Sequence, residues 1–93
     1  MRYAIITNPV SGVTTADQKR AALVQATEIL DTEIYGLDTS TVEEFGQCAR
    51  ELATRCDVIV AAGGDGTFSD IINAIDTAQT PVGFLPLGTG NAM

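Results

Sequence analysis

The sequence has no histidine and few basic residues, and this shortage excludes whole classes of partner. Its 12 aspartates and glutamates outnumber its 5 lysines and arginines, so the net charge is −7. Such an acidic domain repels nucleic-acid phosphates at long range, and neither DNA nor RNA is an expected partner. The same repulsion argues against direct contact with an anionic membrane surface. A phosphate-bearing ligand would need positive potential from backbone N–H groups, helix N-termini or a bound metal ion.

Cysteine and long apolar runs are also scarce. Cys48 and Cys56 fall in one predicted helix, where a rise of ~1.5 Å per residue puts them roughly 12 Å apart, too far for a disulfide. We interpret them as small apolar residues of a reducing compartment. Without histidine or a C-x-x-C pair, no zinc site is expected. No apolar run approaches the ~20 residues of a membrane span, and the short apolar run in Met1–Thr7 does not resemble a signal peptide. We therefore expect a cytoplasmic location.

Strand and helix patterns alternate along the chain, whose 93 residues suit one domain. Strands are predicted at Tyr3–Thr7, Glu33–Tyr35, Asp57–Ala62 and Val82–Leu85. Helices are predicted at Thr15–Leu30 and Ser40–Cys56, with a third marked by Phe68, Ile71, Ile72 and Ile75. Capping-box spacing supports the first two, through Thr15 with Gln18 and Ser40 with Glu43. This order predicts an α/β fold, a three-layer, doubly wound, Rossmann-like parallel sheet.

Three glycine-containing loops follow strands in this scheme. They are Asn8–Gly12, Gly63–Thr67 and Pro86–Asn91, and they hold six of the nine glycines, namely Gly12, Gly63, Gly64, Gly66, Gly88 and Gly90. In a parallel sheet, loops that follow strands share the edge where ligands bind. Glycine allows positive φ and lets backbone N–H groups approach an anion closely. We therefore predict a phosphate site at this edge.

Asp65 is the residue of greatest chemical interest in these loops. It could cap the helix that Thr67 and Phe68 open, contact a phosphate-bound metal, or accept a proton from an attacking hydroxyl. Hydrogen-bond donors suited to phosphate or ribose are Ser11, Thr67, Thr89 and Asn91, although each could equally be a turn or cap residue.

Several known phosphate-binding motifs are missing. The sequence has no G-x-x-x-x-G-K-[ST], no G-x-G-x-x-G after the first strand, and no protein-kinase loop set. These absences disfavour a P-loop protein, a standard dinucleotide Rossmann domain and a protein kinase.

The segments Asn8–Gly12, Gly63–Thr67 and Leu85–Asn91 together resemble the signature loops of the diacylglycerol kinase catalytic domain. That family includes sphingosine, ceramide and bacterial lipid kinases, and it shares its fold and the GGDGT loop with NAD kinases. The resemblance implies that 1–93 is the N-terminal, nucleotide-binding domain of an ATP-dependent lipid kinase. The family's β-rich C-terminal domain, which binds the lipid, is not in this sequence.

The resemblance also assigns candidate site residues and cofactors. It implies ATP with Mg²⁺ and makes Asp65 the candidate catalytic group. The nucleotide contacts it implies are Asn8, Ser11, Gly12, Gly63, Gly64, Gly66, Thr67, Gly88, Thr89, Gly90 and Asn91. Asp70 and Asn73 occupy positions where the family often has an acidic residue and an asparagine on the following helix.

The resemblance further implies that partners would be ATP, a lipid substrate and the missing C-terminal domain, through which alone peripheral membrane contact would occur. We expect the isolated chain to be inactive and to bind ATP weakly at best. Self-association through a surface near Leu87 to Met93 is a further hypothesis. An NAD kinase-like enzyme and a non-catalytic nucleotide-binding or interaction module remain open alternatives.

Overall fold

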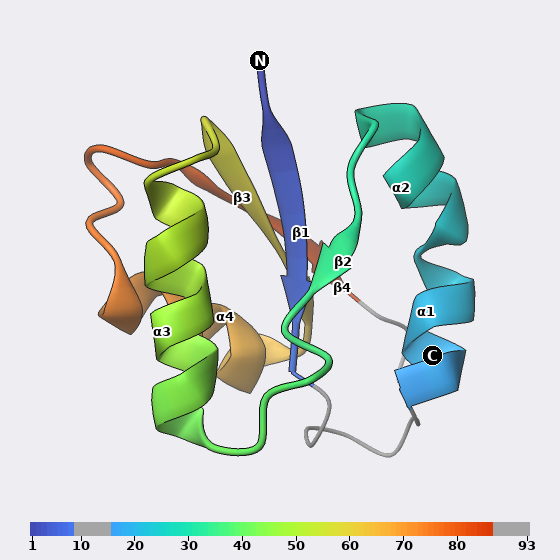
Figure 1. Ribbon diagram of the computed structural model, residues 1–93, viewed down its shortest axis with the longest axis horizontal. Coiled ribbons are helices and arrows are strands. Elements are labelled where there is room, and N and C mark those ends of the chain that lie inside the picture. Colours follow the sequence, from blue (N-terminus) through green and yellow to red (C-terminus); the bar gives the residue numbers. More distant parts are fainter. Residues whose placement is uncertain (9–15, 87–93) are drawn as a thin grey trace.

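A computed structural model describes residues 1–8 and 16–86 of the chain. Strands and helices alternate along it as β1 (Tyr3–Thr7), α1 (Ala16–Ala22), α2 (Val24–Leu30), β2 (Ile34–Tyr35), α3 (Val42–Ala53), β3 (Val58–Gly63), α4 (Asp65–Ala74) and β4 (Val82–Pro86). Figure 1 shows these elements as three layers, with α1 and α2 on one side of the sheet and α3 and α4 on the other. The doubly wound α/β prediction is thereby confirmed.

The sheet has four parallel strands in the order β2-β1-β3-β4. From β1 the chain crosses outward to β2, and from β3 it crosses outward to β4 on the other side. The winding therefore reverses between the central strands β1 and β3, which pair from Tyr3↔Val58 to Thr7↔Ala62. In open α/β sheets the crevice beyond the carboxyl ends of the strands at such a reversal is the usual ligand site.

Apolar side chains on both sheet faces hold the layers together. The larger core cluster joins Ile6 and Ile59 of the sheet to Phe45 and Leu52 of α3 and Ile71 of α4. The smaller cluster, on the α1 and α2 face, consists of Ile5, Leu23 and Ala62, with half-buried apolar residues packed around it. Because β1 and β3 are covered on both faces, they contain almost no polar residues, as expected of central parallel strands.

The predicted helix Thr15–Leu30 is instead two helices, α1 and α2, joined at Leu23. Leu23 has φ −101° and ψ 2°, and its N–H lies 3.1 Å from the Lys19 carbonyl and 3.2 Å from that of Arg20. The irregular turn seats the Leu23 side chain in the smaller cluster, where it is fully buried. Packing against the sheet therefore overrides an otherwise continuous helical pattern. Thr15 of the predicted capping box lies outside the described residues.

The prediction for the second long helix, Ser40–Cys56, was wrong at both ends. The cap of α3 is Thr41, whose hydroxyl accepts a hydrogen bond from the Glu44 N–H at 3.0 Å. The Glu44 carboxylate in turn accepts from the Ser40 N–H at 2.7 Å. The helix ends at Ala53, so Cys56 lies beyond it rather than within it. Both cysteines are free thiols.

No helix in the described part of the chain combines the length and apolar character that crossing a membrane requires.

Candidate functional site

Three strands end at one rim of the sheet, where the glycine-containing loops begin. The last residues of β1 and β3 lie side by side through the pair Thr7↔Ala62, and those of β3 and β4 through Gly63↔Pro86. Asn8 and Gly64 therefore both leave the sheet at this rim, next to the winding reversal. The described residues thus place the starts of all three predicted loops together. Ser11, Gly12, Gly88, Thr89, Gly90 and Asn91 lie outside the described residues.

Gly63, the last residue of β3, must be glycine for backbone reasons. Its φ of +147° is a conformation that residues with a side chain rarely adopt. A Cβ at this position would lie 2.8 Å from the Thr67 hydroxyl oxygen, which is too close. Gly63 is therefore fully explained by the sharp strand-to-helix turn.

Gly64 and Gly66 have no such explanation. A Cβ added to either residue would meet no atom within 4 Å, and neither has a positive φ. Gly64 is the N-cap of α4, and no side-chain hydrogen bond caps the helix. The first turn of α4 consequently offers backbone N–H groups, at the positive end of the helix dipole, to a space that no side chain of residues 1–8 or 16–86 fills. This is the arrangement with which proteins bind phosphate at a helix N-terminus.

Asp65 is the first residue of α4, so it is not the N-cap, and α4 begins two residues earlier than predicted. Within the described residues its exposed carboxylate has no hydrogen bond or ion pair. It therefore stands at the rim, beside the open turn, free to contact a ligand or metal. The Thr67 side chain, by contrast, is only 1% exposed and packs against Gly63, so it stabilises the turn from the protein interior.

Lys19 is a residue of this rim that the sequence-based prediction missed. Its Nζ donates a hydrogen bond to the backbone carbonyl of Asn8, the residue that follows β1. Lys19 is buried, and this desolvation lowers the pKa of its ammonium group from the usual value. No sequence pattern indicates this burial, because a lysine in a short amphipathic helix ordinarily extends into water.

Asp70 and Asn73 are the two helix positions implied by the family resemblance. Both line a cavity of about 340 Å³ between α3 and α4, together with Gly46 and Arg50. The Asn73 side-chain amide donates to the Ser69 hydroxyl at 3.5 Å.

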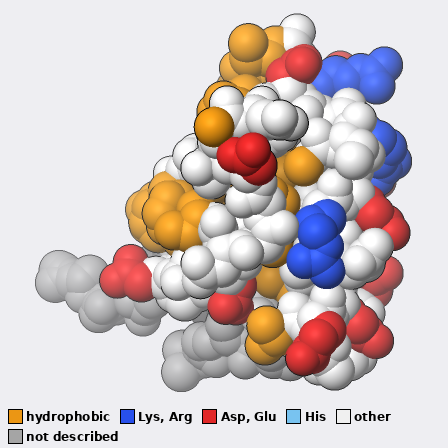
Figure 2. Space-filling model, turned by 90° about the vertical axis from the view of Figure 1, so that its left-hand side faces the viewer, with side chains coloured by type: hydrophobic (Ala, Val, Ile, Leu, Met, Phe, Trp, Pro, Cys, Tyr) orange, Lys and Arg blue, Asp and Glu red, His pale blue; other side chains and the backbone are white. Residues whose placement is uncertain are grey.

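On the α3 and α4 side, little positive charge lies at the end of the molecule where the strands terminate (Figure 2). Seen from the α3 and α4 side, the Lys and Arg side chains lie in the upper and middle parts, and acidic side chains predominate at the lower end, where the strands terminate (Figure 2). Among the described residues, no three histidine, cysteine, aspartate or glutamate side chains gather closely enough to hold a metal ion. Backbone dipoles of the α4 turn and the ammonium group of Lys19 both contribute positive potential at the rim.

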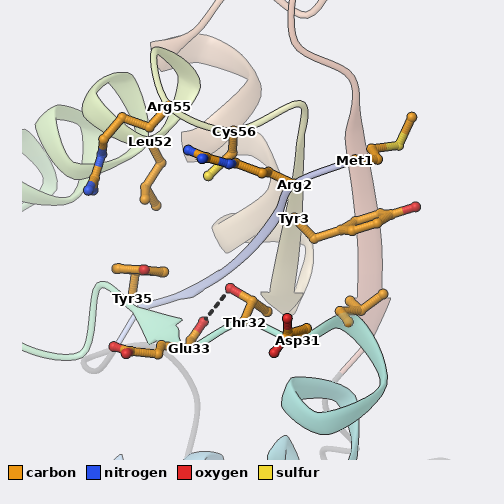
Figure 3. A pocket seen from close by; sticks show the side chains of 11 residues that line it. Met1, Arg2, Tyr3, Asp31, Thr32, Glu33, Tyr35, Leu52, Arg55 and Cys56 are labelled. Carbon is orange, nitrogen blue, oxygen red and sulfur yellow. Dashed lines mark hydrogen bonds between the residues drawn. The ribbon is translucent and has the colours of Figure 1, made fainter.

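A cavity of about 410 Å³ lies at the opposite rim, where β1 begins (Figure 3). Arg2 and Cys56 line one side of it, and Tyr35, Thr32 and Glu33 line the other. Its lining mixes two arginines with Asp31 and Glu33, so it presents no single charge to an anion. It is remote from the open turn of α4 and contains none of the predicted site residues.

The parallel sheet, with helices on both faces and the winding reversal between β1 and β3, defines a doubly wound α/β domain. The model of the diacylglycerol kinase catalytic domain family matches residues 2–93, so the chain belongs to that family. It is 35% identical over 94 residues to a diacylglycerol kinase of Bacillus subtilis and 36% identical over 100 residues to one of Staphylococcus saprophyticus. These matches cover 97% of this chain but only 31% and 30% of the relatives, so the chain spans about a third of their length.

The fold also agrees with that of a solved relative. A crystal structure of a diacylglycerol kinase from Bacillus anthracis str. Sterne superposes with a TM-score of 0.70 at 22% sequence identity. The match covers 91% of this chain and 32% of that one. At this identity the likeness concerns the fold alone.

Proposed function

We propose that this chain is the ATP-binding domain of a lipid kinase, and that it binds the phosphates of ATP at the rim where β1, β3 and β4 end. The observation that carries the proposal is the first turn of α4, where Gly64 and Gly66 leave backbone N–H groups uncovered for no packing reason. Family membership supports ATP as the phosphate donor. The whole of residues 1–93 would form this nucleotide-binding unit.

Each side chain at the rim has a distinct part in the proposal. The N–H groups of the Gly64–Gly66 turn bind phosphate oxygens, with Gly63 shaping the turn and the buried Thr67 supporting it. Asn8 and, from the family resemblance, Ser11, Gly12, Gly88, Thr89, Gly90 and Asn91 complete the nucleotide contacts. Asp65 accepts the proton of the lipid hydroxyl as that oxygen attacks the γ-phosphorus.

Mg²⁺ fits this site only as a partner of the nucleotide. The described side chains form no metal cluster, so the ion would be held chiefly by ATP phosphates, with the unpaired Asp65 carboxylate within the same rim. When bound, Mg²⁺ neutralises charge that develops on the transferred phosphoryl group.

The acceptor is proposed to be a lipid hydroxyl, of diacylglycerol or a related lipid, which is the substrate named for the curated relatives. Because the chain spans about a third of those relatives, the lipid would be bound by the remaining two-thirds. Transfer would then require that second domain. The isolated chain would bind nucleotide without turning it over, as a cytoplasmic domain that meets the membrane only through its partner domain.

A chimera tests the proposal. Replacing the matching third of the Bacillus subtilis diacylglycerol kinase with this chain should yield an enzyme that transfers labelled phosphate from ATP to diacylglycerol. The same chimera with Asp65→Asn should fold and bind ATP but lose transfer. Phosphorylation of NAD instead of lipid would favour the NAD kinase-like alternative. A folded chimera that binds no ATP would favour a non-catalytic interaction module.

A further inference from the structure

Lys19 ties helix α1 to the end of β1, the strand that borders the winding reversal. Its Nζ donates to the carbonyl of Asn8, eleven residues earlier in the chain. Thr7, which precedes Asn8, pairs with Ala62 of β3, so the carbonyl of Asn8 lies just beyond the β1–β3 pair. The hydrogen bond therefore fixes the orientation of the peptide group at the entrance to the phosphate site.

This position is unfavourable for an ammonium group. Lys19 is only 3% exposed, whereas its neighbour Arg20 on the same helix is exposed. Lysine is among the side chains that proteins least often bury, because desolvation of the charge opposes it. A methionine of similar length could fill the same space without that cost. A lysine at position 19 therefore carries a desolvation cost that a methionine would avoid.

A second buried polar group lies at the same strand end. The Thr7 side chain is fully buried, and within residues 1–8 and 16–86 its hydroxyl oxygen has no hydrogen-bond partner. Alternation along β1 places Thr7 on the same sheet face as Ile5, the face covered by α1 and α2. An orphaned buried hydroxyl is unusual in a native protein and calls for an explanation other than packing. Two unfavourable polar groups thus meet beside the proposed phosphate site.

We propose that Lys19 is a positioning residue of this site, holding the Asn8 peptide and bringing positive charge to the β1 end of the rim. The inference rests on the proposed function, because it assigns Lys19 a role toward the phosphates of ATP. Lys19 acts through Asn8 and through its charge, and it takes no part in proton transfer. Its effect should therefore be confined to ligands that carry phosphate.

The test compares two charge-removing variants of the chain, Lys19→Met and Arg20→Met, with the wild type. Both remove one positive charge from α1, and only the first removes the bond to Asn8. Binding of Mg·ATP and of adenosine is followed by ¹H–¹⁵N NMR titration, which measures millimolar dissociation constants, and unfolding is followed by circular dichroism. Adenosine serves as the phosphate-free control. If Lys19→Met does not fold, Lys19→Gln replaces it under the same criteria.

The expected result is a loss of Mg·ATP affinity of about tenfold or more for Lys19→Met, the equivalent of ~1.4 kcal/mol. Its affinity for adenosine and its melting temperature should not fall, and Arg20→Met should bind Mg·ATP nearly as the wild type does. Wild-type affinity in Lys19→Met, equal losses in both variants, or a parallel loss for adenosine would each overturn the inference. A wild-type chain that binds no Mg·ATP would refute the proposed function first, and the role of Lys19 with it.

Discussion

Two glycines of the same turn should respond in opposite ways to the same substitution. Gly66 lies within the first turn of α4, and a Cβ there would meet no atom within 4 Å. Alanine is favoured over glycine in helices by about 0.5–1 kcal/mol, so Gly66→Ala should stabilise the folded chain by about 0.5 kcal/mol near the helix end. For a domain of this size, such a gain raises the melting temperature by roughly 2–4 °C.

Gly63→Ala introduces the same methyl group three residues earlier, where the structure opposes it. The φ of +147° and a Cβ contact of 2.8 Å with the Thr67 hydroxyl both strain the folded state. Holding a residue with a side chain in such a backbone region costs about 1–3 kcal/mol, so the melting temperature should fall by at least ~4 °C. Thermal and urea unfolding of the two variants and the wild type measure the difference.

Nucleotide binding should separate stability from function in this pair. If the open space at Gly66 is where phosphate binds, the added methyl group weakens Mg·ATP binding by about tenfold, or ~1.4 kcal/mol, even though the fold is more stable. The measurement is an NMR titration of each variant with Mg·ATP. A Gly66→Ala variant that is more stable and binds with undiminished affinity would show that the open turn is not a phosphate site.

Three further substitutions test separate parts of the account. Thr41→Ala removes the hydrogen bond between the Thr41 hydroxyl and the Glu44 N–H that caps α3, and it should lower the free energy of unfolding in urea by about 1 kcal/mol. The Ser40 side chain is not the α3 cap, so Ser40→Ala should change the free energy of unfolding by less than ~0.5 kcal/mol. Thr7→Val replaces a buried hydroxyl that has no partner and should raise stability by about 1 kcal/mol; a loss of stability would mean that the hydroxyl is satisfied in solution. Asp65→Asn, at an exposed carboxylate without hydrogen bonds, should alter stability by less than ~1 kcal/mol. In the Bacillus subtilis chimera it should reduce phosphoryl transfer by about 100-fold or more, and retained transfer would remove Asp65 from the chemistry.

The fold could be predicted from the sequence because its signals are local and repeated. The apolar run Asp57–Ala62 identified a strand covered on both faces, and the alternation of elements then implied parallel pairing, as found. The cap of α3 could not be fixed in the same way. Both Ser40 with Glu43 and Thr41 with Glu44 satisfy the capping-box spacing, and only the structure distinguishes them.

The features missed at the sequence level depend on tertiary packing. No glycine or proline marks the helix break at Leu23. The break arises because the Leu23 side chain inserts between the helices and the sheet. The burial of Lys19 likewise depends on how α1 lies over the end of β1. For Asp65, the glycine spacing predicted its location beside a helix N-terminus, but not that Gly64 would be the cap.

The central claim is that the strand ends of β1, β3 and β4 form one phosphate-binding rim. An NMR titration of the wild-type chain with Mg·ATP tests it most directly, because each backbone amide reports separately. We expect the largest shifts on Asn8, Gly64, Asp65 and Gly66, while the amides of Arg2, Thr32 and Cys56 at the opposite cavity remain unchanged. Shifts centred on that cavity, or none at the α4 turn, would contradict it.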